Sequence, residues 1–215
     1  MQLSNLGWDS FFETNFAPLK EQGFSAMRIA RENLGQYLAL SELGEYTCEI
    51  SGRYRFEADS KGKYPAVGDW VAVSVRPDEN KATIHALLPR KSAFSRKVAG
   101  EITDEQVVAA NIDTIFIVIG LDLNFNLRRI ERYLSVAWDS GAVPVVLLNK
   151  ADLCPGIEDR RGEVESIAFE VAVNTLSATQ NAGLEPLNQY IKRGKTVAFL
   201  GSSGVGKSTI INALL

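Results

Sequence analysis

The sequence predicts an α/β domain with a doubly wound sheet, preceded by a small all-β barrel. Between residues 37 and 89, short alternating segments are separated by Gly, Pro, Asp and Asn, which is typical of a barrel of short strands. After residue 110, apolar runs alternate with helical segments, as in a parallel sheet covered by helices. Loops with Gly, Asn and Asp follow these runs, where open α/β sheets bind ligands.

The composition is that of a globular protein with a packed core. The chain has 215 residues, of which 46% are hydrophobic and 23% charged, and this excludes extensive disorder. Its net charge of −3 argues against a general nucleic-acid binder. The two cysteines form no Cys/His cluster, so we expect reduced thiols. There is no signal pattern and no apolar run of the ~20 residues that span a bilayer, so we expect a cytoplasmic protein without a membrane partner.

Residues 1–36 are predicted to form an N-terminal helical extension. Large apolar side chains recur there at intervals of three and four residues, which places them on one helix face. These residues are Trp8, Phe11, Phe12, Phe16 and Leu19. We expect this face to pack on the following domain.

Residues 37–97 are predicted to form an OB-like barrel followed by a basic linker. Strands are expected at residues 37–40, 46–50, 53–57, 70–75 and 83–88. Five-stranded barrels of the oligonucleotide-binding (OB) type bind nucleic acid on one face. An SH3-like barrel would give a similar pattern, so the pattern alone leaves both barrels open.

The linker after the barrel is basic and contains an aromatic residue. Residues 51–97 hold ten Lys and Arg against five Asp and Glu, an asymmetry that predicts an anionic partner. Lys and Arg neutralise phosphates, and Phe can stack on a base. We therefore predict RNA contacts from Arg90, Lys91, Phe94, Arg96 and Lys97. The alternative is a solvated interdomain linker.

Residues 98–215 are predicted to form the α/β domain, incomplete at its C-terminus. The apolar run 114–120 predicts a strand buried on both faces. Further strands are expected at residues 143–148, 171–176 and 196–200, with helices at 127–138, 157–169, 184–193 and from about 207.

Residues 201–208, Gly-Ser-Ser-Gly-Val-Gly-Lys-Ser, match the P-loop pattern G-x-x-x-x-G-K-[ST] between a predicted strand and a predicted helix. Glycines let the backbone wrap a phosphate, and the helix N-terminus favours negative charge. We expect Lys207 to contact the β- and γ-phosphates and Ser208 to place its hydroxyl on Mg²⁺. The predicted GTP-binding residues of this loop are Gly201, Ser202, Ser203, Gly204, Val205, Gly206, Lys207, Ser208 and Thr209.

Asn149-Lys150-Ala151-Asp152 matches the guanine-reading motif N-K-x-D and directly follows the predicted strand 143–148. The Asp152 carboxylate can accept hydrogen bonds from N1–H and the 2-amino group of guanine. Adenine has neither donor there and would leave the carboxylate unpaired, which gives discrimination. We expect Asn149 to hold the base and the loop, and the stem of Lys150 to cover the base.

The nucleotide motifs occur in permuted order. Ser177-Ala178 ends the strand after N-K-x-D, and we expect the Ala178 N–H to reach guanine O6. The P-loop comes last, whereas in an ordinary small GTPase it comes first. The sequence therefore predicts a circularly permuted P-loop GTPase domain. No general base is identifiable, so catalysis is expected to come from positioning and electrostatics.

Two other interpretations stay open on the residues alone. Asp122 follows the apolar run 114–120 and imitates a Walker B aspartate, which would make the chain a P-loop ATPase or kinase. An RNA-binding module with a vestigial nucleotide site is the second. Asp59-Ser60-Lys61-Gly62 also matches the GTPase motif D-x-x-G, but its place in the barrel region predicts a turn.

The succession of barrel, basic linker, N-K-A-D, S-A and G-S-S-G-V-G-K-S-T resembles the ribosome small-subunit-dependent GTPase family (RsgA/YjeQ). The likeness is carried by residues 128–133, 147–153 and 201–212 and covers about residues 37–215. The resemblance implies an OB domain that binds rRNA and a permuted GTPase domain that hydrolyses GTP to GDP with Mg²⁺. It also implies a role in late maturation of the small ribosomal subunit. We expect a monomer.

Members of that family continue past the P-loop helix into a switch threonine, a D-x-x-G motif and a zinc-binding C-terminal domain. This sequence stops at Leu215, seven residues after Ser208. We therefore expect a truncated chain that hydrolyses GTP poorly, and zinc only in the C-terminal domain that the sequence lacks.

Overall fold

The computed structural model describes residues 2–58, 60–97, 105–122 and 125–215, without the side chains of Lys61, Pro77, Lys97 and Glu105. The chain forms two compact units. The first comprises Met1–Ile112 with Arg193–Thr196, and the second comprises Asp113–Lys192 with Val197–Leu215.

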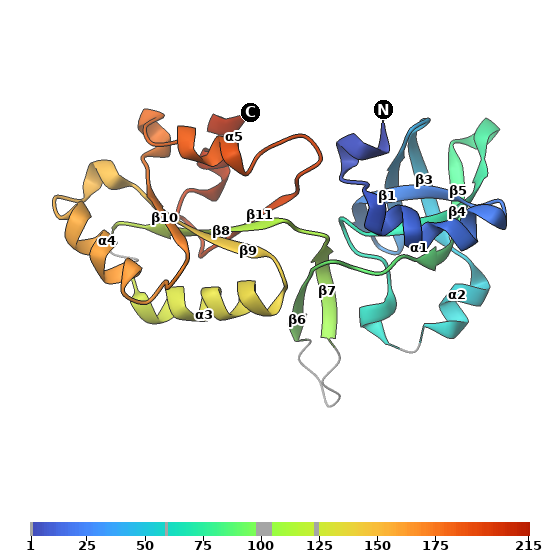
Figure 1. Cartoon of the computed structure of the whole chain (residues 1–215), viewed down its shortest axis with the longest axis horizontal. Coiled ribbons are helices and arrows are strands. Elements are labelled where there is room, and N and C mark those ends of the chain that lie inside the picture. The colour runs from blue at the N-terminus through green and yellow to red at the C-terminus, as the bar shows by residue number, and fades with distance from the viewer. Residues whose placement is uncertain (1, 59, 98–104, 123–124) are drawn as a thin grey trace. The chain divides into compact units, whose positions relative to one another are not determined.

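The first unit is built on a closed five-stranded barrel with the spatial order β1-β2-β3-β5-β4, in which only β3 and β5 run parallel to each other. The strands are β1 (Ser25–Asn33), β2 (Gln36–Ser41), β3 (Gly44–Ile50), β4 (Trp70–Arg76) and β5 (Lys81–Leu87). Helix α2 (Gly52–Glu57) lies between β3 and β4 in the chain (Figure 1). The interior is apolar and contains Met27, Ile29, Val71, Val73 and Ile84. This arrangement is of the OB type.

Two predicted elements of this unit are wrong. The helix predicted through residue 36 ends early, because α1 (Ser10–Glu21) stops before Gly23, whose φ is +86°. The following strand β1 pairs with both β2 and β4, which outweighs the helix propensity of its Ala, Arg and Glu residues. Residues 53–57, predicted as a strand, form helix α2, because the Ser51 hydroxyl caps it by accepting from the Tyr54 N–H at 3.1 Å.

Helix α1 packs on the barrel through aromatic side chains, as its spacing predicts. The short turn η1 (Leu3–Leu6) precedes it. Phe12 and Phe16 are buried and share one apolar cluster with Trp70 of β4. The ring of Trp8 meets that of Trp70 edge-on, with 4.7 Å between the ring centroids.

A two-stranded hairpin follows the barrel. Strand β6 (Ala93–Lys97) pairs antiparallel with β7 (Glu105–Ala110), so part of the predicted linker is a strand. The hairpin is joined to the segment before β4, because the Ala110 N–H donates to the Val67 carbonyl oxygen at 2.8 Å. The turns η2 (Lys61–Lys63) and η3 (Pro77–Glu79) complete the unit.

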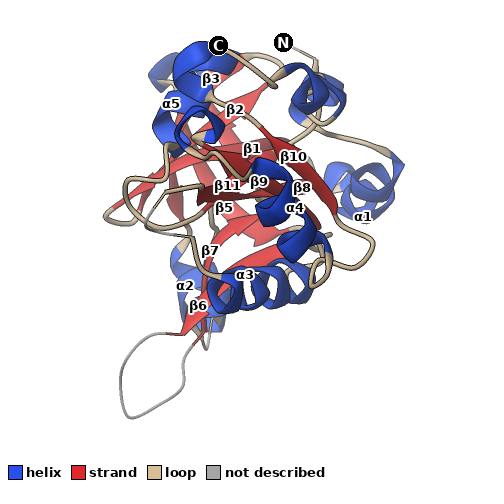
Figure 2. Cartoon of the chain, turned by 90° about the vertical axis from the view of Figure 1, so that its left-hand side faces the viewer, coloured by secondary structure: helices blue, strands red, loops and turns tan. Residues whose placement is uncertain are grey.

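The second unit is a four-stranded parallel sheet with the order β10-β9-β8-β11. Its strands are β8 (Thr114–Gly120), β9 (Val143–Asn149), β10 (Ala172–Thr175) and β11 (Val197–Leu200). Helices α3 (Leu127–Asp139) and α5 (Lys207–Leu214) lie on opposite faces of this sheet in Figure 1. Helix α4 (Ile157–Glu165) packs against β10, and Figure 2 shows the helices in blue beside the red strands.

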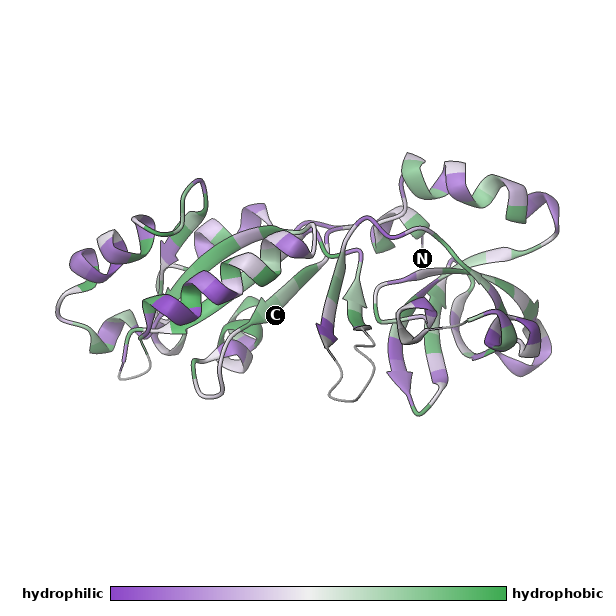
Figure 3. Cartoon of the chain, turned by 90° about the horizontal axis from the view of Figure 1, so that it is seen from below, coloured by the Kyte–Doolittle hydropathy of each residue, from purple (hydrophilic) through white to green (hydrophobic). Residues whose placement is uncertain are grey.

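Burial explains why these strands were predictable. Every residue of β8 is buried. The sheet is largely green in Figure 3, whereas its helices alternate between purple and green along their length. Apolar side chains on both faces of a strand are typical of parallel sheets covered on both sides.

Helix lengths in this unit differ from the prediction. The helix expected at residues 157–169 ends at Glu165, and the one expected at 184–193 is only the turn η6 (Glu185–Gln189). The backbone turns at both ends of that segment, at Gly183 and Gly194, which both have positive φ. The turns η4 (Ala151–Leu153) and η5 (Ala178–Gln180) follow β9 and β10.

Within the described ranges, none of the helices combines the length and the apolar character needed to cross a membrane. In the same ranges, no three or more His, Cys, Asp or Glu side chains gather in a way that could hold a metal ion.

Candidate functional site

The P-loop connects β11 to α5 and lies close to β8. A Cβ atom at Gly201 would lie 2.5 Å from the Val118 carbonyl oxygen, so the loop passes β8 at a distance that only glycine allows. The Lys207 ammonium donates to the carbonyl oxygens of Gly201 and Ser202, each at 2.8 Å. Its positive charge is thereby held within the loop at the N-terminus of α5, where the helix dipole also favours an anion.

The other predicted P-loop residues divide by exposure. Val205 is buried in the core of the unit, and Gly206 lies half-buried beside it. The exposed residues of the loop and of the first turn of α5 are Ser203, Gly204, Ser208 and Thr209.

Asn149 joins the guanine-reading motif to the P-loop and to Ala178. This residue ends β9 and is only 3% exposed. Its Nδ2 donates to the Val205 carbonyl oxygen at 2.9 Å, and its Oδ1 accepts from the Ala178 N–H at 3.1 Å. A Cβ atom at Gly206 would lie 2.3 Å from Asn149 Nδ2. Three motifs that are far apart in the chain are therefore assembled by one amide side chain.

Asp152 and Ser177 are also brought together. The Ser177 hydroxyl donates to Asp152 Oδ1 at 2.5 Å and lies 3.2 Å from the Thr179 hydroxyl. Ser177 is buried, whereas Asp152 is exposed. The bond orients a carboxylate that can still accept from a ligand.

Lys150 forms an ion pair with Asp122. The backbone of Lys150 has φ +66°, and its ammonium lies 2.7 Å from Asp122 Oδ2. The ATPase interpretation assigned Asp122 to Mg²⁺ as a Walker B residue. In the structure this carboxylate is bound instead by the lysine of the guanine-reading motif.

Two features of the site were not predicted. Arg129 of α3 donates from Nη1 to the Ser202 hydroxyl at 3.3 Å, and a single arginine on an amphipathic helix carries no sequence signal for such a contact. The Ala178 N–H, expected at guanine O6, donates here to Asn149.

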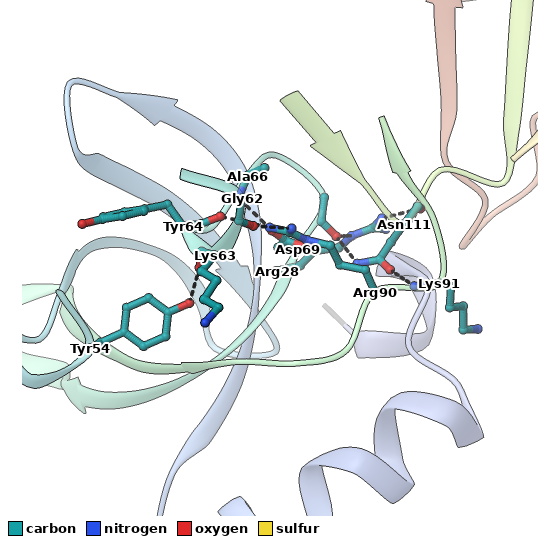
Figure 4. A network of polar contacts seen from close by, with 11 residues as sticks. Arg28, Tyr54, Gly62, Lys63, Tyr64, Ala66, Asp69, Arg90, Lys91 and Asn111 are labelled. Carbon is teal, nitrogen blue, oxygen red and sulfur yellow. Dashed lines mark hydrogen bonds and ion pairs between the residues drawn. The ribbon is translucent and has the colours of Figure 1, made fainter. Parts of the chain in front are cut away.

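Arg90, predicted to contact RNA, is bonded inside the first unit. Figure 4 shows its guanidinium beside the carboxylate of Asp69, with Nε–Oδ1 and Nη2–Oδ2 distances of 2.8 and 2.7 Å. It also donates to the carbonyl oxygens of Gly62 and Tyr64 at 2.7 and 2.9 Å. The Asp69 side chain is 0% exposed and that of Arg90 16%. This cation is therefore neutralised by a buried partner, which argues against the predicted RNA contact.

The rest of the basic segment has mixed surroundings. Lys91 forms an ion pair with Asp9 and lies 4.9 Å from the ring centroid of Phe12. Phe94 is half-buried in β6, and the exposed Arg96 donates to Gln106 Oε1 at 3.2 Å. The side chain of Lys97 lies outside the described residues, as does Asp59 of the D-x-x-G match.

Comparisons with known proteins agree with these observations. The model of the RsgA GTPase family matches residues 87–215. Two relatives described as the small ribosomal subunit biogenesis GTPase RsgA come from Opitutus terrae and Syntrophotalea carbinolica. They are 48% and 41% identical, each over 100% of this chain and over 61% and 60% of their own lengths. The chain thus spans about three fifths of these relatives.

Two solved structures share the fold. YjeQ from Thermotoga maritima has a TM-score of 0.72 at 24% identity, covering 89% of this chain and 65% of its own. YloQ, described as a circularly permuted GTPase, has a TM-score of 0.65 at 21% identity, covering 88% and 63%. The predicted fold class, an OB-type barrel before a circularly permuted P-loop GTPase domain, is confirmed.

Proposed function

The chain belongs to the RsgA GTPase family, and from that membership we propose that it binds GTP, hydrolyses it to GDP and acts in late maturation of the small ribosomal subunit. The observation that carries the proposal is the position of Asn149, which bonds both Val205 of the P-loop and Ala178. This arrangement gives one site a phosphate-binding part and a base-reading part.

Guanine selection is assigned to Asp152. Its exposed carboxylate, oriented by Ser177, is suited to accept from N1–H and the 2-amino group of guanine. An adenine would leave this charge without donors, which costs affinity. Lys150, held by Asp122, would cover the base with its stem. Because the Ala178 N–H is bonded to Asn149, its contact with guanine O6 is not part of the proposal.

Phosphate binding is assigned to the P-loop and Lys207. A β- or γ-phosphate can take over the Lys207 ammonium from the loop carbonyls as a stronger, charged acceptor. A Mg²⁺ ion fits the chemistry here, because Ser208 offers a hard oxygen donor beside the phosphate oxygens that this ion prefers. The ion would neutralise phosphate charge, and the chain's own residues would position the nucleotide.

The partner is assigned from the relatives. Their names place them in biogenesis of the small ribosomal subunit, and barrels of the OB type bind nucleic acid. We assign rRNA binding to the barrel unit. We place the protein in the cytoplasm, where Cys48 and Cys154 would stay free thiols, and we expect a monomer.

The test is a titration of the chain with a fluorescent GDP analogue and Mg²⁺, competed by GTP, ATP and XTP. We expect displacement by GTP and not by ATP. Asp152→Asn should weaken GTP and favour XTP, because an amide can donate to the 2-oxo group of xanthine. Asp139→Asn removes an exposed charge elsewhere in the same unit and should change neither preference. Displacement by ATP, or an Asp152→Asn variant with unchanged preference, would refute the proposal.

A further inference from the structure

A cavity of about 540 Å³ lies in the first unit beside the β6–β7 hairpin. It is lined by the β1–β2 turn, by the segment before β4 and by the hairpin itself. Its volume is in the range of sites that hold a small ligand or a nucleotide. Of the RNA contacts predicted from the sequence, only Arg96 lines this cavity.

Hydrogen bonds join the hairpin to the segment before β4. Besides the bond from Ala110 to Val67, the Asn111 Nδ2 donates to the Gly68 carbonyl oxygen at 3.0 Å. A Cβ atom at Gly68 would lie 2.1 Å from the Ala110 carbonyl oxygen, so this approach requires glycine. The site is therefore built by the fold and does not depend on one surface side chain.

Two tyrosines line the cavity. Tyr37 is only 4% exposed, and burial, with a smaller effect of the Glu32 charge, raises the pKa of Tyr37 to about 12. Its hydroxyl therefore stays protonated at neutral pH and can both donate and accept. Tyr64 is half-buried, and Figure 4 shows its ring pointing away from the Arg90 network.

Polar and apolar groups complete the lining. Arg96 and Gln106 of the hairpin offer N–H donors, and Glu32 offers an acceptor. Val67 and Val108, 40% and 44% exposed, face the same cavity. Aromatic rings, a guanidinium plane, an amide and apolar walls together match the way proteins hold unstacked RNA bases.

We propose that this cavity binds an unstacked nucleobase of single-stranded RNA, with Tyr64 and Arg96 as its stacking groups. The inference rests on the proposed function in taking RNA as the partner. Two exposed cations near Tyr37 favour RNA over an uncharged peptide. Arg55 acts on the charge of Tyr37, and Arg31 lines a neighbouring hollow together with Tyr37. Phosphates on either side of the bound base would meet these cations.

The experiment measures fluorescence anisotropy of the full chain with a labelled single-stranded RNA of about twelve nucleotides and with an abasic RNA of the same length. Tyr64→Ala should weaken binding of the base-containing RNA about tenfold, because one stacking contact is lost. It should leave binding of the abasic RNA and the salt dependence unchanged, since no charge is removed.

Matched variants separate stacking from folding. Tyr64→Phe keeps the ring and should bind as the unmodified chain does. Phe56→Ala removes a 92% exposed ring that does not line the cavity and should have no effect. Thermal unfolding of each variant verifies that the barrel is intact.

Three results would overturn the inference: equal loss on both RNAs for Tyr64→Ala, equal loss for Phe56→Ala, or an unmodified chain that does not prefer the base-containing RNA. The fluorescent GDP titration is run on the same samples. If the unmodified chain does not bind guanine nucleotide, the proposed function is refuted. The preference for base-containing over abasic RNA, and its dependence on Tyr64, test only the proposed role of the cavity.

Discussion

Lys207 and Arg90 are both cations predicted to meet phosphate, but their surroundings differ. Lys207 in the second unit is bonded to two neutral carbonyl oxygens of its own loop. Arg90 in the first unit is bonded in two places to the buried carboxylate of Asp69. A cation held by carbonyls keeps its net charge for a ligand, whereas a cation paired with a carboxylate does not.

The difference shows what kind of sequence evidence identifies a binding residue. The P-loop lysine is predicted from its spacing to the loop glycines and to the preceding strand. The same spacing determines that backbone groups of the loop surround it. The basic segment was predicted from local composition, which does not reveal a partner such as Asp69 twenty-one residues away. Substitutions in both regions test this difference between the two cations.

The largest effect is expected for Arg90→Ala. It leaves the Asp69 carboxylate buried without its cation, which costs about 3–5 kcal/mol of folding free energy. Urea unfolding of the barrel unit is the measurement. Arg96→Ala, at an exposed arginine in the same segment, is the control and should be close to neutral. An Arg90→Ala chain that is as stable as the unmodified chain but binds RNA more weakly would support the prediction that Arg90 contacts RNA.

Lys207→Ala should leave the fold intact and weaken guanine-nucleotide binding. The loss of a charged hydrogen bond to phosphate corresponds to about 3 kcal/mol, or about 100-fold in Kd. The fluorescent GDP titration gives the value. Lys192→Ala, at an exposed lysine of the same unit, should bind normally. Comparable losses in the two variants would mean that the P-loop charge has no special role.

Gly206→Ala should damage the base-reading and phosphate-binding parts together. The new methyl group would meet Asn149 Nδ2 at 2.3 Å and the backbone lies at φ +98°, a strain of about 1–3 kcal/mol. We expect weaker nucleotide binding and a lower unfolding temperature. In α4, Gly162→Ala meets nothing within 4 Å and should be neutral or slightly stabilising. An undamaged Gly206→Ala chain would show that Asn149 does not depend on this approach.

Lys91→Ala should have the smallest effect. Its ion pair with Asp9 is between side chains 41% and 47% exposed, so solvent screens it and the loss stays below about 1 kcal/mol. The effect should fade in high salt, which urea unfolding at two salt concentrations would reveal. A large loss of unfolding free energy that does not depend on salt would mean that Lys91, like Arg90, is a structural cation.

Prediction from sequence worked where local patterns decide the structure. The buried run of β8 and the motifs after β9 and β11 have a fixed relation to the chain, so the predicted strand before Asn149 and the predicted helix from Lys207 are confirmed. The roles of these two residues in nucleotide binding stay predictions. Strand β1 and helix α2 were missed because partner strands and the Ser51 cap decide them. Arg129 and the cavity beside Tyr64 arise from tertiary approach, for which the sequence carries no periodic signal.

The strand order of the second unit also bears on its synthesis. Strand β8 lies between β9 and β11 in the sheet, but β11 is the last of the four strands to leave the ribosome. Until it emerges, β8, which is mostly apolar, has an unpaired edge, a state that invites association with other chains. The same late segment brings Val205 to Asn149, so the pairing of this edge and the bond between these two loops are completed together.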